Sequence, residues 1–189
     1  MLFCLCVEQR APLSVQIMLK KVLFVLLLVS AGVLFFAPIK PVLSIRNRKN
    51  NSEKYYKGLA RIETFEIAYT HSVNKGRVHD FYSTRKKGGL LLTKTRFVSY
   101  GAGIPEPGEI PGSQFYVTED GYEIRGVDRF VGNLVMAVGL IANHTITFYK
   151  NGSDIVESEY ALTDLFAPQT SIILEIKRVS LLSYILHKL

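Results

Sequence analysis

The sequence predicts an all-β domain, an antiparallel β-sandwich or barrel, with an N-terminal transmembrane helix and a short C-terminal helix. Short runs in which apolar and polar residues alternate with period two fill residues 62–179. Gly, Asn, Asp and Pro separate these runs, and no long helical pattern interrupts them. With 48% hydrophobic residues, including 10 Tyr and 11 Phe, the chain can bury the core of one domain.

The N-terminal segment is predicted to be a signal anchor over residues 22–39. Val22 to Ala37 contains no charge and no proline, and Lys20-Lys21 precedes it. A membrane-spanning helix needs about 20 apolar residues, so this run is at the short end of the range.

A cleaved signal peptide is the alternative for the same segment, because a basic pair before an apolar run is typical of secretory signals. Val29-Ser30-Ala31 would then be the cleavage site. We favour the uncleaved anchor because the apolar run continues through Phe36. Residues 1–21 are then a cytoplasmic tail or contain a mis-assigned start, with Met18 as the true one.

The net charge of +7 is concentrated before the folded domain. Residues 1–57 contain nine basic and two acidic residues, whereas residues 58–189 contain fourteen of each. A nucleic-acid-binding domain would carry a basic face of its own, so we exclude nucleic acid as a partner. Basic residues beside an apolar segment indicate a lipid membrane. Residues 40–60 are interpreted as a basic linker, either a clamp on anionic headgroups or a solvated spacer.

Two features of the flanking residues disagree about topology. Three basic residues precede the apolar run and six follow within twenty residues, which by the positive-inside rule places the domain in the cytoplasm. The signal-like order of basic pair and apolar run indicates export. We predict a single-pass cell-membrane protein with a β-rich domain, residues 61–189, on the extracytoplasmic side.

A β-hairpin is predicted over residues 62–84. Apolar and polar residues alternate over 65–70, and residues 77–83 form the returning strand. Asn74-Lys75-Gly76 forms the turn, in which Gly76 is free to take a positive φ.

The rest of the chain is predicted to be short strands and one long loop. The strand Leu90–Tyr100 leads into the loop Gly101–Ser113, whose four Gly and three Pro exclude regular structure. A loop of this length in a compact domain is often functional. Further strands are expected at Gln114–Thr118, Tyr122–Arg125, Asn133–Ala142, Thr145–Tyr149, Ile155–Tyr160 and Thr170–Val179. A helical turn is expected at 161–166, and a short amphipathic helix at 182–189.

The β-hairpin carries the residue types that could perform chemistry. His71 and Ser72 end its first strand, and His79 and Asp80 lie on the second. Ser, His and Asp can form an activated nucleophile, and two His with a carboxylate can bind a metal. Neither set has a familiar spacing, and neighbouring residues of a strand point to opposite faces, so His71 does not activate Ser72. We expect no catalytic residue, no metal and no cofactor, and favour a non-enzymatic role.

Two motifs resemble a known family. They are Phe65-x-Ile67-x-Tyr69-Thr70-His71-Ser72-Val73 and Phe97-x-Ser99-x-Gly101-Ala102-Gly103-Ile104-Pro105, with an acidic residue, Asp80, between them. The sequence is similar in these motifs to domain of unknown function 1850, a family of small bacterial and archaeal proteins that usually shows Glu where Asp80 stands. The family typically has a signal or anchor and one β-rich domain. It is often encoded beside tripartite ATP-independent periplasmic (TRAP) transporters whose receptor is called TAXI.

The resemblance implies an extracytoplasmic accessory of a solute transporter, and no catalytic mechanism. Our leading hypothesis is therefore a membrane-anchored domain that binds a TRAP permease or a TAXI-type solute receptor. The alternative is a solute-binding module, because the His71 hairpin and the Gly101 loop flank one strand. A third hypothesis is a hydrolase or metalloprotein built on His71, Ser72, His79 and Asp80. The candidate binding residues are Tyr69, His71, Ser72, Asp80, Ser99, Gly101, Ala102 and Gly103.

Overall fold

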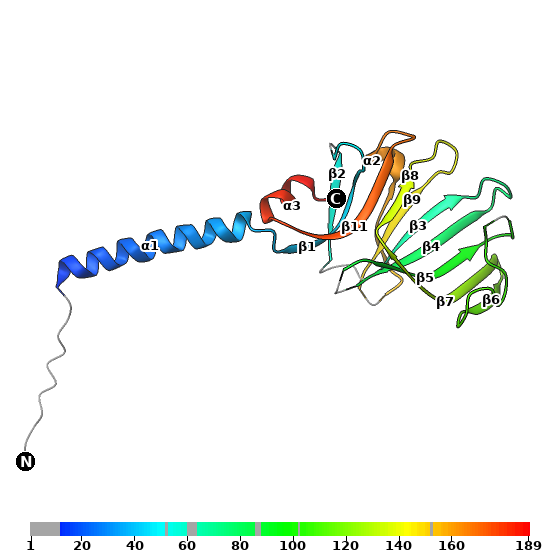
Figure 1. Ribbon diagram of the computed structural model, residues 1–189, viewed down its shortest axis with the longest axis horizontal. Helices are drawn as coiled ribbons and strands as arrows, with labels where there is room; N and C mark the ends of the chain where they lie inside the picture. The colour runs from blue at the N-terminus through cyan, green and yellow to red at the C-terminus, as the bar shows by residue number, and fades with distance from the viewer. Residues whose placement is uncertain (1–11, 52, 60–63, 86–87, 102, 152) are drawn as a thin grey trace, which may run out of the picture.

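The computed structural model describes residues 12–51, 53–59, 64–85, 88–101, 103–151 and 153–189, which form two antiparallel sheets and three helices (Figure 1). The helices are α1 (Leu13–Phe36), α2 (Leu162–Leu165) and α3 (Leu181–His187). The strands are β1 (Lys40–Asn47), β2 (Lys54–Gly58), β3 (Thr64–Thr70), β4 (Arg77–Thr84), β5 (Leu90–Phe97), β6 (Gln114–Thr118), β7 (Gly121–Gly132), β8 (Leu134–Ala137), β9 (Thr145–Tyr149), β10 (Val156–Ala161) and β11 (Ser171–Val179). The predicted all-β class with an N-terminal and a short C-terminal helix is confirmed.

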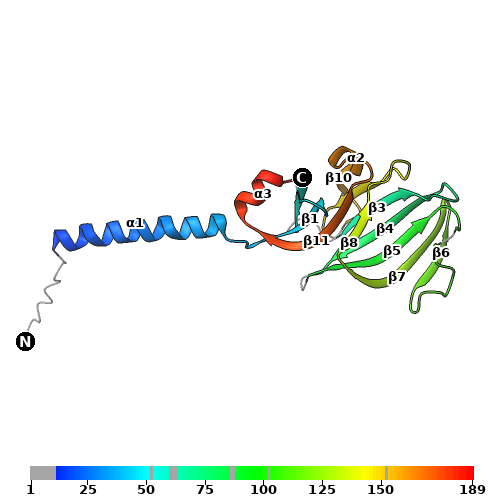
Figure 2. The ribbon, with the colours of Figure 1, turned by 45° about the horizontal axis from the view of Figure 1, so that its top comes forward.

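Helix α1 projects away from the sheets and buries none of its residues (Figures 1 and 2). It is long and apolar enough to cross a membrane, a property that anchors share with signal sequences at this position. The helix begins after Pro12, nine residues before the predicted start at Val22. Good helix formers continue the pattern back to Leu13, and Pro is well tolerated at a helix N-terminus.

Strands β1 and β2 contradict the prediction of an unstructured basic linker over residues 40–60. β1 pairs with β11 along its whole length, from Lys40 opposite Val179 to Asn47 opposite Ile172, and β2 pairs with β1 on the other side. Two of the basic residues in this segment have acidic partners from distant strands. Arg46 Nε lies 2.9 Å from Glu175 Oε1, and Lys57 Nζ lies 3.1 Å from Glu157 Oε2.

The strands are arranged as a two-layer sandwich. The smaller sheet has the order β2-β1-β11-β8, and the larger has the order β10-β9-β3-β4-β5-β7-β6. The chain crosses from the larger to the smaller sheet between β7 and β8, directly after Gly132, which has a φ of 69°. That left-handed backbone conformation is readily available only to glycine and reorients the chain.

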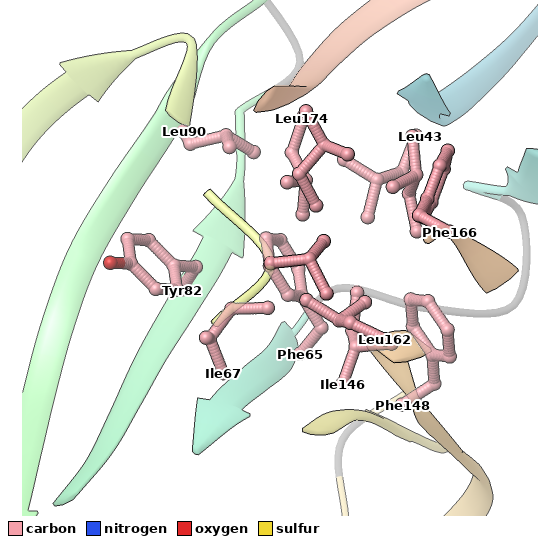
Figure 3. Close-up of a cluster of buried hydrophobic side chains, with 13 residues drawn as sticks. Leu43, Phe65, Ile67, Tyr82, Leu90, Ile146, Phe148, Leu162, Phe166 and Leu174 are labelled. Carbon is pink, nitrogen blue, oxygen red and sulfur yellow. The ribbon is translucent and has the colours of Figure 1, made fainter. Parts of the chain in front are cut away.

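The main core lies between the two sheets (Figure 3). Leu43 of β1 and Leu174 of β11 come from the smaller sheet, and Phe65 of β3 and Phe148 of β9 come from the larger. All four are fully buried. Burying a side chain of this size contributes about 1.5–3 kcal/mol, so this contact holds the layers together.

Most predicted strands are present, with three changes in length. β5 ends at Phe97, three residues before its predicted end at Tyr100. The predicted hairpin is present as β3 and β4 and pairs Thr64 with Ser83, although Lys75 rather than Gly76 takes the positive φ (60°). β7 continues seven residues beyond the predicted end at Arg125. β8 stops at Ala137, because the next residue, Val138, bonds to the loop before β11 instead of continuing along that strand.

Candidate functional site

An open cavity of about 1160 Å³ lies on the inner face of the larger sheet. Its floor is formed by β3, β4, β5 and β7, and its cover is the segment after β5, residues 98–101 and 103–113, here called the cavity loop. The lining residues are Tyr69, Val78, Asp80, Tyr82, Leu92, Thr95, Tyr100, Gly101, Gly103, Ile104, Pro105, Glu106, Glu109, Ile110, Pro111, Val127 and Arg129.

Apolar contacts hold the cavity loop over the sheet. Ile104 and Ile110 pack against a second buried cluster, formed by Val78, Phe97, Ile124 and Val127. Through these contacts the loop forms a wall of the cavity.

Tyr82 separates the cavity from the main core. Its ring stacks on Phe65 at 5.3 Å between centroids and belongs to the core cluster. Its hydroxyl points away from the other side chains of that cluster (Figure 3). Burial and the charge of Asp80 raise the pKa of the Tyr82 hydroxyl, so it remains a hydrogen-bonding group at neutral pH.

Asp80 is the acidic group on the floor of the cavity. Period-two alternation along β4 places Val78, Asp80 and Tyr82 on the inner face. The hydroxyl of Thr95 on β5 donates a hydrogen bond of 2.7 Å to Asp80 Oδ1. Burial raises the pKa of Asp80 above its usual value, while the Thr95 hydrogen bond and the charge of Arg129 act in the opposite direction.

Tyr69 of β3 lies on the same inner face and is influenced by the charge of Asp80. Burial, together with the charge of Asp80, raises the pKa of Tyr69 to about 12. The floor therefore combines a desolvated carboxyl with neutral phenol groups, a set that can orient a polar ligand by hydrogen bonds.

His71 organises the β3–β4 turn. Its Nδ1 accepts hydrogen bonds from the backbone N–H groups of Val73 (3.3 Å) and Asn74 (3.4 Å). Its backbone N–H and carbonyl close the turn onto Gly76 and Lys75. These contacts give His71 a structural role.

Asn74 joins this turn to the cavity loop. Its Nδ2 donates to the carbonyls of Ser99 (2.7 Å) and Tyr100 (2.9 Å), and its Oδ1 accepts from the N–H of Gly76. The sequence identified Asn74 only as a turn residue. The presence of Asn, with both a donor and an acceptor, at the centre of a long turn is the signal that could have identified it.

Gly101 allows the turn and the loop to approach each other. A Cβ at this position would lie 2.8 Å from Asn74 Nδ2 and 3.0 Å from His71 Cε1. The structure therefore brings together His71 and Gly101, as the sequence analysis anticipated, and Gly101 also borders the cavity.

The remaining predicted site residues are spread around this junction. Tyr69, Asp80 and Gly103 line the cavity, and Ser99 contributes its carbonyl to Asn74. Ser72 is exposed, and its carbonyl accepts from Lys75 Nζ. Ala102 lies outside the described residues.

His79 lies on the opposite face of the sheet from Asp80. Its Nδ1 is 2.5 Å from Glu66 Oε1, and Tyr149 of β9 donates to Glu66 Oε2. Burial raises the pKa of Glu66, but the hydrogen bonds from His79 and Tyr149 outweigh burial and leave the pKa below its usual value. The proposed combination of His71, His79 and Asp80 is thus separated between a turn and two faces.

A second ionic cluster on this outer face is centred on Glu123 of β7. Arg96 Nη2 lies 3.0 Å from Glu123 Oε2, Lys94 Nζ lies 3.7 Å from the same atom, and Arg125 also binds the carboxylate. Sequence analysis missed both outer-face clusters, although the alternation of charged residues over 94–96 and 123–125 was visible.

Within the part of the chain that the structure describes, no group of three His, Cys, Asp or Glu side chains could hold a metal ion. The cavity combines apolar walls with a small polar floor, an arrangement suited to ligand binding.

A model of the family described as Domain of unknown function (DUF1850) matches residues 65–154. This part of the chain is a DUF1850 domain. The match contains β4 to β9 and nearly all of β3, and with them the whole cavity lining. No curated protein and no solved structure matches the chain. Strands β1, β2, β10 and β11 lie outside the matched residues and complete the two sheets.

Proposed function

We propose that this protein is a membrane-anchored, extracytoplasmic domain that binds a small organic solute carrying an amine in the cavity covered by the cavity loop. The single observation that carries the proposal is the cavity itself, in which a desolvated carboxyl, Asp80, lies among apolar walls. Pockets for small molecules typically have a few convergent polar groups in such surroundings. The apolar helix α1, preceded by Pro12 and extending to Phe36, supports the anchor.

The charges around the cavity favour a cationic ligand over an anionic one. Asp80, Glu106 and Glu109 line it, against the one guanidinium of Arg129 among the described lining residues. An ammonium group that donates to Asp80 would restore the solvation that the carboxyl loses by burial. Ile104 and Ile110 would cover the apolar part of the ligand.

Asp80→Asn tests this assignment. The full chain in detergent is screened by thermal shift against amines, neutral polyols and carboxylates, and affinities for the stabilising amines are then measured by calorimetry. We expect amines to raise Tm, and Asp80→Asn to weaken binding tenfold or more, since a hydrogen bond to a charged group contributes about 1.5–3 kcal/mol.

His79→Asn is the matched control, because His79 is the adjacent residue of β4 and its side chain lies on the outer face. It should leave amine affinity within about twofold. Absence of stabilisation by any amine, or equal affinity of Asp80→Asn and the unmodified chain, would contradict the proposal.

A protein partner at the far end of the domain is the second function that we propose. Val73 in the β3–β4 turn and Leu140 and Ile141 in the β8–β9 loop are large, exposed apolar residues. The two segments are adjacent, because the N–H of Thr70 donates to the carbonyl of Ala142. Exposed apolar residues grouped in this way suit a protein contact. On the basis of the resemblance, we propose that this partner is a TRAP permease or a TAXI-type solute receptor.

Co-purification tests this partnership. The tagged full chain, solubilised from membranes in mild detergent, should retain the permease or the receptor. The double variant Leu140→Ser/Ile141→Ser should lose most of it, whereas Val117→Ser, at an equally exposed position on β6, should not. Clean separation of the unmodified chain from both proteins would count against the partnership.

A further inference from the structure

Helix α3 lies beside the end of α1 that faces the folded domain (Figures 1 and 2). α1 ends at Phe36 and β1 begins at Lys40, so three residues connect them. Three residues span at most about 10 Å. If α1 crosses a membrane, as proposed above, the smaller sheet and α3 are held at its surface.

One side of α3 is packed onto the smaller sheet. Tyr184 contacts the cluster formed by Val42, Tyr56 and Val179. The Ser180 hydroxyl caps the helix by accepting a 3.1 Å hydrogen bond from the N–H of Ser183. The orientation of α3 is therefore fixed, and so is the direction in which its other side faces.

That other side is apolar and exposed. Ile185 is 58% exposed, Leu186 is 68% exposed and Leu181 is 40% exposed. Ile39, in the connector from α1, is also exposed. A short helix that lies beside a membrane-spanning segment and exposes an apolar face is suited to the interface between headgroups and acyl chains.

The charges around this apolar face complement anionic lipid. Lys188 follows the helix, Arg178 precedes it and donates to the carbonyl of Ile39, and Lys40 Nζ lies 4.3 Å from the centre of the Tyr184 ring. Residues 176–189 contain no acidic residue. Each basic residue near an anionic membrane surface contributes attraction to the headgroups.

We propose that α3 lies in the headgroup region of the membrane crossed by α1, with Ile185 and Leu186 against the acyl chains. Lys40, Arg178 and Lys188 then face the lipid phosphates. This placement rests on the proposed anchor. It fixes the folded domain with the smaller sheet toward the lipid and the cavity loop away from it.

The absence of Trp from the chain allows a direct test. Ile185→Trp places a single indole on the exposed side of α3, and the full chain is reconstituted into nanodiscs that contain phosphatidylglycerol and brominated phosphatidylcholine. We expect blue-shifted emission and at least twofold quenching relative to nanodiscs without bromine. Val117→Trp, at a position 76% exposed on the distal strand β6, should show neither effect.

Leu186→Trp provides a second probe if Ile185→Trp does not fold. Quenching of the α3 probes no stronger than that of Val117→Trp, in protein that has entered the nanodiscs, would overturn the placement of α3 alone. Failure of the unmodified chain to enter nanodiscs would overturn the anchor, and the placement with it. Replacing phosphatidylglycerol by zwitterionic lipid should reduce the quenching, and unchanged quenching would overturn the role of the basic residues.

Discussion

At the scale of single residues, the junction between the β3–β4 turn and the cavity loop depends on Gly101 and Asn74. Asn74 binds two carbonyls of the loop, and Gly101 leaves room for it. Because the turn and the loop meet through these two residues, the position of the loop over the cavity is coupled to the turn that His71 organises.

Gly101→Ala should reduce the free energy of unfolding by about 1–3 kcal/mol, the usual cost of forcing a methyl group into a packed site. The new Cβ would clash with both Asn74 and His71. In an Asn74→Ala background, Gly101→Ala should reduce the free energy of unfolding by less, because the clash with the Asn74 side chain is removed. Urea unfolding of the four variants of this cycle gives the coupling, and fully additive losses would refute the proposed contact.

The proximity of His71 to Gly101 could be predicted, because His71 follows β3 and Gly101 follows β5, and these two strands run in the same direction on either side of β4. Asn74 could be recognised as a turn residue with both a donor and an acceptor, but its partners, the carbonyls of Ser99 and Tyr100, could not be predicted because they are 25 and 26 residues away. Hydrogen bonds of this kind leave no local pattern. The separation of His79 from Asp80 follows directly from strand alternation.

At the scale of secondary-structure elements, Glu66 joins three strands on the outer face of the larger sheet. It lies on β3, is 6% exposed, and binds His79 of β4 and Tyr149 of β9. A buried carboxylate hydrogen-bonded to an imidazole and a phenol stabilises the fold only while it is ionised.

Glu66→Gln should lower the free energy of unfolding at pH 7 by about 1.5–3 kcal/mol, the contribution of hydrogen bonds to a charged group. The folded pKa of Glu66 is below its usual value of 4.5, so its contribution is present above pH 4.5 and is lost as pH falls through the folded pKa. The difference between the two proteins should therefore shrink below pH 4.5. Urea unfolding from pH 7 to pH 3 measures it.

Tyr149→Phe is the control for this prediction. It removes one hydrogen-bond donor and keeps the carboxylate of Glu66. The free energy of unfolding at pH 7 should therefore fall by less than in Glu66→Gln. A difference between Glu66→Gln and the unmodified chain that stays constant from pH 7 to pH 3 would contradict the assignment.

The elements themselves differ in how well the sequence predicts them. β3 and β4 form a hairpin whose alternation and turn are contiguous in the chain, and both were predicted. β1 was not, because its partner β11 lies near the C-terminus and Arg46 is neutralised there by Glu175. The local sequence does not distinguish a basic residue that pairs with an acid more than a hundred residues away from one that lies in a solvated linker.

At the scale of the whole molecule, the sandwich has two different ends. α1 and α3 lie at one end, and the β3–β4 turn lies at the other (Figure 1). In the proposed anchored state, the solute cavity and the apolar residues Val73 and Ile141 face away from the lipid. A solute or a partner could then reach them without displacing the membrane contact.

The three-residue connection between α1 and β1 also affects how the domain meets a partner protein in the same membrane. An anchored domain on so short a tether moves by lateral diffusion and keeps its distal end at a nearly constant height above the bilayer. The domain then meets another membrane protein by diffusion in two dimensions, with the binding surfaces of both proteins at similar heights above the bilayer. The shortness of residues 37–39 would thus raise the effective concentration of the domain near any partner embedded in the same bilayer.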